Sequence, residues 1–188
     1  MAANAPRREA LLDAAISVIA ERGTRGLTFR AVDANAGTPA GTASNYFASR
    51  DEMIAQVFER IGARLAPDPA EVDRLSQRQP SKELFADYVR YIVTRLSAER
   101  DVTIALFELR LEASRNLRIA ELVQNWVSTG FAADVAFNEQ AGLPGGSGQI
   151  ALFHYALDGL MLDRLTAPID PSTSTDQVID QLVEGLLE

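Results

Sequence analysis

Apolar residues recur at helical spacing in successive segments of the chain. In residues 7–22, Leu12, Ile16 and Ile19 follow one another at i, i+4 and i+7, and Gly23 comes next. The same pattern returns in a series of later segments, which are residues 49–66, 81–98, 101–114, 149–165 and 174–187, with a long one from Asn116 to the glycine-rich break at 141–148. These segments predict an all-α fold.

Capping signals mark the starts of several of these helices. Ser49 with Glu52, and Ser174 with Gln177, match the capping box, in which each partner accepts a hydrogen bond from the backbone N–H of the other. Asp101 is placed to cap the helix that follows it.

A domain boundary is expected after the helix of residues 49–66. Residues 67–80 contain three prolines in a polar mixture, with room for one helical turn at 70–76. A long irregular stretch is unusual inside one compact domain. We therefore predict an amino-terminal domain of residues 1–48, continued by the linking helix 49–66, and a second helical domain of residues 67–188.

Residues 28–47 have the pattern of two short helices joined by a tight turn. Thr28 can cap the first helix, and Gly37 suits the left-handed turn that ends one. Pro39 is tolerated in the first turn of the second helix, residues 38–47. The apolar positions fall on facing sides of the two helices, at Phe29, Val32 and Ala36 on the first and at Ala43 and Phe47 on the second.

The outward face of the second helix is small, polar and free of carboxylates. It consists of Ala40, Gly41, Thr42, Ser44, Asn45 and Tyr46. Small residues let a helix backbone come close to DNA, and hydroxyl and amide groups reach base edges or phosphates in the major groove. We interpret this segment as the recognition helix of a helix-turn-helix.

Residues 7–60 resemble the amino-terminal domain of TetR-family transcriptional regulators. The resemblance covers four segments without a gap, LLDAAISVIAERG, LTFRAVDANAG, TPAGTASNYF and ASRDEM. The family often has Val-Ser-Lys where this chain has Thr38-Pro39-Ala40, and Leu-Tyr-His at residues 43–45. These departures concern the operator sequence rather than the fold. The resemblance implies a DNA phosphate contact by Arg50, and the candidate DNA-binding residues are Thr28, Arg30, Thr38, Ala40, Gly41, Thr42, Ser44, Asn45, Tyr46 and Arg50.

The net charge of −8 does not exclude a DNA partner, because the charge is unevenly distributed. Residues 1–66 hold eight arginines and seven carboxylates, a net charge of +1, whereas residues 67–188 hold ten cations and nineteen carboxylates, a net charge of −9. An acidic protein with a locally less acidic tip can still bind an operator.

Composition leaves few candidates for catalysis or metal binding. With no Cys and a single His, thiolate chemistry is impossible and a His-based metal site is improbable. His154 and Asp158 are spaced to hydrogen-bond on one helix, but no motif adds the serine of a triad. We expect a structural pair, no cofactor, no metal and no enzymatic activity.

The resemblance implies a small, largely apolar effector bound among the helices of the second domain. Its candidate contacts are Tyr88, Tyr91, Phe107, Arg110, Trp126 and Phe131. On spacing alone these aromatic residues fit a filled core better than a ligand site, and only the resemblance reverses this preference. The alternative is therefore a constitutive DNA-binding regulator with no effector.

The last two helices carry more apolar residues than one packing partner needs. We expect a homodimer through these helices, bound to double-stranded, palindromic operator DNA as a repressor that the effector releases. Residues 1–10 lack the apolar core of a signal peptide, and about 18 consecutive apolar residues occur nowhere. The expected location is the cytoplasm, with no membrane partner.

Overall fold

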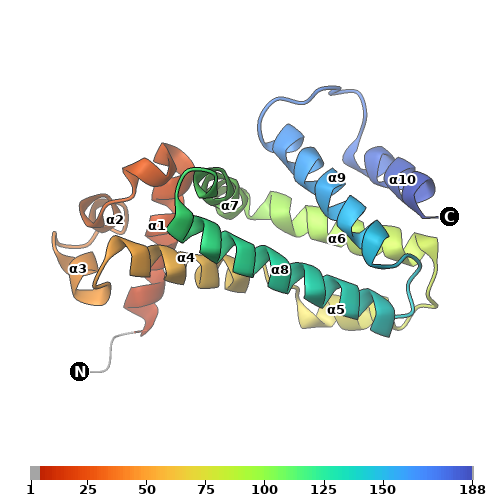
Figure 1. The fold of residues 1–188 in the computed structure, drawn as a ribbon, viewed down its shortest axis with the longest axis horizontal. Coiled ribbons are helices and arrows are strands. Elements are labelled where there is room, and N and C mark those ends of the chain that lie inside the picture. The colour runs from red at the N-terminus through yellow and green to blue at the C-terminus, as the bar shows by residue number, and fades with distance from the viewer. Residues whose placement is uncertain (1–4, 188) are drawn as a thin grey trace. The chain divides into compact units, whose positions relative to one another are not determined.

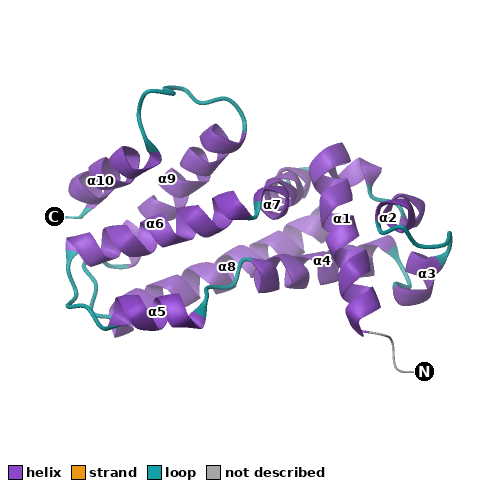
Figure 2. Ribbon diagram, turned by 180° about the vertical axis from the view of Figure 1, so that it is seen from behind, coloured by secondary structure: helices purple, strands orange, loops and turns teal. Residues whose placement is uncertain are grey.

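The computed structural model describes residues 5–187, and every regular element within them is an α-helix (Figure 1; Figure 2). The all-α prediction is confirmed. Two compact units form: the residues up to Ala66 with Glu99–Trp126, and Pro67–Ala98 with the residues from Val127 onward. Glu99–Trp126 thus packs with the amino-terminal helices, and the predicted domain division at residue 66 stays a prediction. None of the described helices is long and apolar enough to cross a bilayer.

The first unit is built on its amino-terminal helix. Helix α1 (Ala5–Gly26) packs against α2 (Phe29–Asn35), α4 (Arg50–Arg64) and α7 (Arg100–Ala113). It is interrupted at Gly23, where φ is +68°, and resumes for one short turn. The predicted break at this glycine is confirmed. It occurs here because only a residue without a side chain adopts this backbone conformation readily.

The core of the first unit is mostly aliphatic. Its largest fully enclosed side chains, each at most 1% exposed, are Leu11, Ile16, Ile19, Leu27, Phe47, Met53, Ile54, Ile61 and Leu109. Burying a side chain of this size stabilises a fold by about 1.5–3 kcal/mol relative to leaving it in water. This core fixes α1, α4 and α7 as a frame for the two short helices.

A bidentate ion pair joins α1 to α4 at the edge of this core. Arg60 donates from Nε to Asp13 Oδ1 at 2.8 Å and from Nη2 to Asp13 Oδ2 at 2.7 Å. Arg64 lies 3.4 Å from the same carboxylate and also pairs with Glu99. The parallel geometry makes this the strong form of an arginine–carboxylate contact.

The second unit is arranged around one helix. Helix α6 (Lys82–Ala98) packs against α5 (Pro69–Ser76), α9 (Ser147–Leu165) and α10 (Thr175–Leu186). The remaining helix, α8 (Leu117–Gln140), has its first residues in the first unit and the rest in the second.

Helix starts follow the capping signals with two exceptions. The capping box of Ser174 and Gln177 is complete. Asp101 was predicted to cap α7. The helix instead begins at Arg100, so Asp101 lies in its first turn, where the helix dipole favours a carboxylate. Ser49 accepts from Glu52 N–H at 3.0 Å, but the Glu52 carboxylate accepts from Ala48 N–H at 2.7 Å, outside the predicted box.

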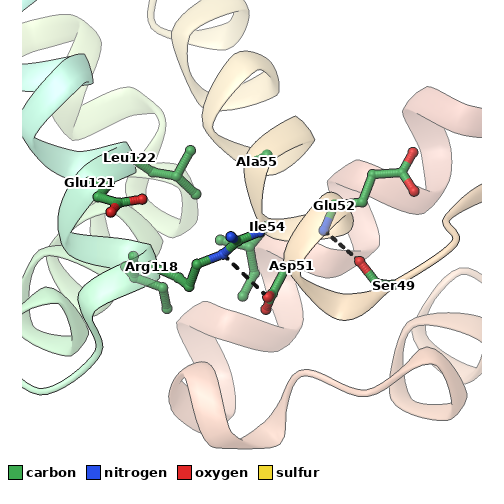
Figure 3. A pocket seen from close by; sticks show the side chains of 9 residues that line it. Ser49, Asp51, Glu52, Ile54, Ala55, Arg118, Glu121 and Leu122 are labelled. Atoms are coloured by element: carbon green, nitrogen blue, oxygen red, sulfur yellow. Dashed lines mark hydrogen bonds and ion pairs between the residues drawn. The ribbon is translucent and has the colours of Figure 1, made fainter.

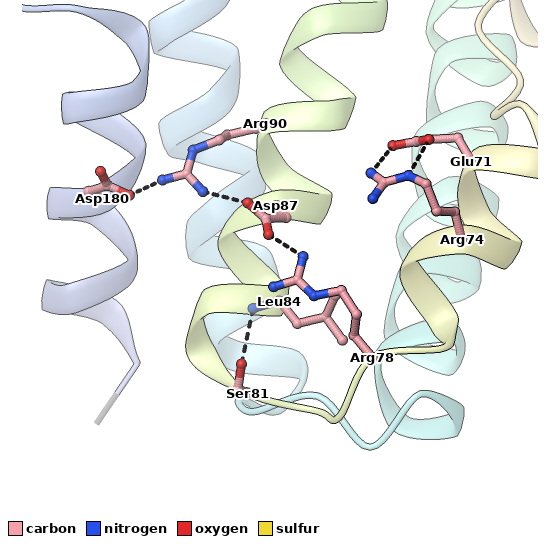
Figure 4. Close-up of polar contacts among 8 residues, drawn as sticks. All are labelled: Glu71, Arg74, Arg78, Ser81, Leu84, Asp87, Arg90 and Asp180. Carbon is pink, nitrogen blue, oxygen red and sulfur yellow. Dashed lines mark hydrogen bonds and ion pairs between the residues drawn. The ribbon is translucent and has the colours of Figure 1, made fainter.

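Charged side chains tie α6 to its neighbours in the second unit (Figure 4). Asp87 accepts from Arg78, which follows α5, and from Arg90 one turn further along α6. Arg90 also pairs with Asp180 of α10. Burial raises the pKa of Asp87, but hydrogen bonds from both arginines and their charge outweigh it and hold the pKa below its usual value.

We predict that Asp13→Asn lowers the free energy of unfolding at pH 7, because it removes the ion pairs with Arg60 and Arg64. The expected loss is about 1 kcal/mol, a small value, because water partly screens these pairs. Burial raises the pKa of Asp13, but the hydrogen bonds and charges of Arg60 and Arg64 outweigh it, so the pKa lies below its usual value. Such a carboxyl stabilises the fold above its unfolded pKa, and the contribution is lost as the pH falls through its folded pKa.

Thermal denaturation of wild type and Asp13→Asn should therefore differ fully at pH 7 and converge below about pH 4. Glu21→Gln is the matched control on α1, because Glu21 is exposed and only a 3.8 Å contact to Arg22 is lost. A difference that persists unchanged to strongly acidic pH would contradict this role of Asp13.

Candidate DNA-binding surface

Helix α2 begins and ends where its sequence predicts. Thr28 Oγ1 accepts a hydrogen bond from Ala31 N–H at 3.1 Å, which caps the first turn. Ala36 closes the helix, and Gly37 follows with φ at +62°. Thr38 N–H then donates to the Asp33 carbonyl at 2.9 Å, which turns the chain back toward the next helix.

The next helix is shorter than predicted. Helix α3 is Thr42–Tyr46, whereas the sequence predicted a helix over residues 38–47 with Pro39 in its first turn. Residues 38–41 instead form a turn that ends in Gly41, with φ at +90°. The positive φ of Gly41 is incompatible with a right-handed helix, and glycine adopts it readily, so the helix begins only after Gly41.

A buried carboxylate holds the start of α3. The Asp33 side chain, 2% exposed, reaches across from α2. Its Oδ2 accepts from Gly41 N–H and its Oδ1 from Ala43 N–H, both at 2.7 Å, and Thr38 Oγ1 donates to Oδ1 at 3.3 Å. These N–H groups have no partner within α3, because the first N–H groups of a helix never do. We call this set of contacts the Asp33 clamp.

The sequence contains a signal for the Asp33 clamp that the predicted DNA-binding residues do not include. Asp33 lies four residues after Phe29, beside Val32, and therefore on the apolar face of α2. A carboxylate at such a position is expected to be paired, because an unpartnered buried charge is costly. It was counted only as one of the acidic residues of the domain.

The two short helices face each other as predicted. Val32, Ala43 and Phe47 are buried in the core of the first unit, and Phe29 and Ala36 pack against it. This packing directs the other face of α3 outward.

The outward residues of α3 and its turn are accessible to differing degrees. Ala40, Gly41, Ser44 and Asn45 are exposed, while Thr42 and Tyr46 are half-buried. The hydroxyls of Thr42 and Ser44 donate to the carbonyls of Pro39 and Gly41, at 2.6 and 2.9 Å. Within the described chain the Asn45 amide makes no hydrogen bond, so both of its polar atoms are available to a ligand.

The other four candidate residues differ in how firmly the fold holds them. Thr28 and Arg30 are exposed at the start of α2. Thr38 is half-buried on the Asp33 clamp. Arg50 donates to the carbonyls of Leu27 and Thr24, at 3.1 and 2.5 Å, so it also joins the start of α4 to the end of α1 and the turn before α2. Its expected phosphate contact stays a prediction.

An acidic groove of about 360 Å³ lies beside these residues, between the starts of α4 and α8 (Figure 3). Asp51 and Arg118 face each other across it at 3.6 Å, and Glu52 and Glu121 add two more carboxylates. Because three carboxylates outnumber one arginine, the groove disfavours phosphate. We therefore limit the candidate DNA-binding surface to α3, its turn and the adjoining ends of α2 and α4.

The predicted effector contacts divide equally between the two compact units. Phe107, Arg110 and Trp126 belong to the first unit, where the Trp126 indole lies against Gly62 of α4, with Nε1 3.8 Å from where a Cβ would stand. The remaining three, Tyr88, Tyr91 and Phe131, belong to the second.

In the second unit, Tyr88 is 8% exposed, and its hydroxyl has no hydrogen-bond partner in the described chain. Its ring meets the edge of Phe137 at 5.1 Å. The Tyr91 hydroxyl accepts from Asp68 N–H at 2.6 Å. Tyr88 therefore offers a buried polar group, whereas the Tyr91 hydroxyl already has a donor.

The single histidine has a different partner from the one that its spacing indicated. His154 Nε2 lies 3.0 Å from Asp134 Oδ2 on α8, and its ring meets Phe131 edge to face at 5.7 Å. His154 therefore joins α9 to α8.

Two short helices, a left-handed turn and an outward face without carboxylates define the class of helix-turn-helix proteins. Family comparison agrees: residues 11–57 match the bacterial regulatory proteins of the tetR family, and residues 80–188 match the tetracyclin repressor-like carboxy-terminal domain. The chain belongs to the TetR family, whose members are transcriptional regulators and not enzymes. Among curated proteins, none matches this sequence.

Solved structures share the fold along nearly the whole chain. SCO1917 of Streptomyces coelicolor A3, a TetR-family member, is 24% identical with a TM-score of 0.71, covering 97% of this chain and 98% of its own. FadR of Bacillus subtilis, in complex with stearoyl-CoA, is 18% identical with a TM-score of 0.70, covering 95% and 97%. The multidrug binding protein EbrR, complexed with ethidium, is 22% identical with a TM-score of 0.69, covering 98% and 100%.

We predict that Asp33→Asn destabilises the first unit by about 1–3 kcal/mol, because it turns an NH₂ group toward one of two N–H donors and leaves that donor unsatisfied. Thermal denaturation measures the loss, and binding to a duplex should weaken with it. Asp73→Asn on α5 is the matched control, because Asp73 is exposed. Equal midpoints for Asp33→Asn and wild type would show that the Asp33 clamp contributes nothing.

Proposed function

We propose that the protein is a dimeric, cytoplasmic repressor that binds a palindromic operator through α3 and is released by a small, largely apolar effector. The observation that carries this proposal is the outward face of α3, which the Asp33 clamp holds in place and which presents no carboxylate. A fixed helix with hydroxyl and amide groups on its outer side suits the major groove.

Local charge supports the choice of surface. Arg25 and Arg30, which flank the start of α2, are exposed and can face phosphates. The excess of carboxylates lies after residue 66. Because non-specific affinity depends on cations that neutralise phosphates, a protein with this charge should bind random DNA weakly and depend on contacts to bases.

We predict that Asn45→Ala weakens binding to a tightly bound duplex by about 1–3 kcal/mol, roughly 5- to 150-fold, because an amide that reads a base edge contributes this much. Thr42→Ala should act in the same direction. Fluorescence anisotropy with a labelled duplex measures the affinity. Gln124→Ala, an exposed amide on α8, should leave the affinity unchanged. Unaltered affinity in both α3 variants would remove them from the DNA contacts.

An uncovered apolar face on α9, together with a groove between α9 and α10, supports the dimer. Leu152, Tyr155 and Leu162 of α9 are 47, 71 and 51% exposed, and their spacing of three and seven residues places them on one side of the helix. An apolar groove of about 410 Å³ runs between α9 and α10. Contiguous exposed apolar surface marks an interface. A twofold pair would set the two copies of α3 about 34–36 Å apart, or a multiple of that, over a palindrome.

We predict that Leu162→Glu converts a dimer to monomers, because two buried carboxylates would face each other near the twofold axis. Sedimentation at micromolar concentration should give half the wild-type mass. Leu117→Glu is the matched control, since Leu117 is 85% exposed and lies on α8 in the first unit. A wild-type protein that sediments as a monomer would refute the proposed dimer.

The buried Tyr88 hydroxyl supports an effector site in the second unit. Burial raises the pKa of Tyr88, and its hydroxyl has no described partner. Leaving a buried polar group unsatisfied costs about 1–3 kcal/mol, which a ligand with one hydrogen-bonding group would offset. FadR is in complex with stearoyl-CoA and EbrR with ethidium, so similar folds accommodate molecules with a large apolar part. In the alternative of a constitutive regulator, a buried water would satisfy Tyr88 instead.

We predict that Tyr88→Phe weakens effector binding about 5-fold, the loss of one hydrogen bond, without lowering the thermal midpoint. Trp126 is the only tryptophan and lies against Gly62 of α4, so its emission should change if the effector moves α4. Acyl-CoA thioesters and planar aromatic cations are the first compounds to titrate. If no compound changes the emission, the thermal midpoint or DNA binding, the constitutive alternative holds.

A further inference from the structure

The carboxy-terminal end of α3 needs its own support. The helix has five residues, and one turn of helix is not stable alone in water. The Asp33 clamp holds only its beginning. At its end Phe47 is buried, and Tyr46 is half-buried, with its ring only in part against the core.

Arg8 of α1 lies over this end of α3. Its guanidinium carbon is 5.8 Å from the centroid of the Tyr46 ring and 5.4 Å from that of Phe47. Both distances are within the range of a cation–π contact. One half-buried arginine thus contacts the last residue of the helix and the residue that ends it.

A chain of hydrogen bonds links the same guanidinium to the backbone behind α3. Arg8 Nη1 donates to Gln56 Oε1 at 2.6 Å, and Gln56 Nε2 donates to Glu52 Oε1 at 3.0 Å. Glu52 Oε2 then accepts from Ala48 N–H at 2.7 Å. Arg8 therefore contacts the rings directly and reaches the backbone after Phe47 through two side chains of α4.

We infer that Arg8 is a positioning residue for operator recognition: it fixes the Tyr46 ring and the end of α3 rather than neutralising a phosphate. This role rests on the proposed function of the same surface. A planar guanidinium can stack on two rings while it donates in its own plane to Gln56, which a lysine ammonium cannot do. The role therefore depends on the shape of the side chain as well as on its charge.

Arg8→Lys tests this role, because it keeps the charge and removes the planar group. The expected result is a roughly 5- to 30-fold loss of affinity for a selected duplex, as for the loss of a well-placed cation–π contact with its hydrogen bond. Affinity for a random duplex, and the slope of log affinity against log salt, should stay at the wild-type values, since the number of neutralised phosphates is unchanged. Arg22→Lys makes the same change on an exposed part of α1 and should alter neither affinity.

Gln56→Ala breaks the same network from the other side and leaves Arg8 in place. It should lower the ratio of the affinity for the selected duplex to that for a random duplex. The Arg8→Lys, Gln56→Ala double variant should lose less binding free energy than the sum of the two single losses, because both changes disrupt the same network. This second variant decides the matter should Arg8→Lys unfold.

Wild-type affinity for the selected duplex in both Arg8→Lys and Gln56→Ala would overturn the positioning role. A salt slope that falls by about one in Arg8→Gln but not in Arg8→Lys, with specificity kept in the lysine variant, would identify Arg8 as a phosphate contact instead. If the wild-type protein bound no duplex at all, the proposed function would fall, and the role of Arg8 with it.

Discussion

The hydrogen bonds of the buried Asp33 carboxylate are the contacts on which the geometry of the candidate DNA-binding surface depends. Burying a charge is costly unless strong donors surround it. The free N–H groups of Gly41 and Ala43 supply those donors, and they are the groups that a helix start leaves unpaired. One interaction therefore satisfies both the carboxylate and the helix terminus. A five-residue helix can have a defined direction because a neighbouring helix provides its cap.

The remaining helices of the first unit stabilise this arrangement from behind. Asp13 fixes α4 against α1, and Arg50 fixes the start of α4 against the turn that precedes α2. At the other end of α3, Arg8 contacts the Tyr46 ring and donates to Gln56 of α4. Polar contacts between helices thus set directions that an aliphatic core alone would leave variable, since apolar packing is not directional.

Periodicity, caps and breaking residues predicted most helices of the fold, because these signals are local. The break at Gly23, the cap at Thr28 and the box at Ser174 could be read directly. The start of α3 was not predicted, because it depends on the Asp33 side chain, which reaches across the turn to Gly41 and Ala43. Long-range pairings were also beyond reach: spacing gave His154 a partner on its own helix, and packing gave it Asp134 on another. Of the residues predicted to face outward on α3, Ser44 and Asn45 are exposed, because the apolar residues face inward, whereas Thr42 and Tyr46 are half-buried.

The most direct test of the central claim is a selection of bound duplexes from a random DNA pool, with the purified protein at low salt. A rigid reading helix presented by two copies of the chain predicts enrichment of an inverted repeat whose half-sites lie about one helical turn apart, or a multiple of that. A pool in which no sequence is enriched over the input would contradict the account.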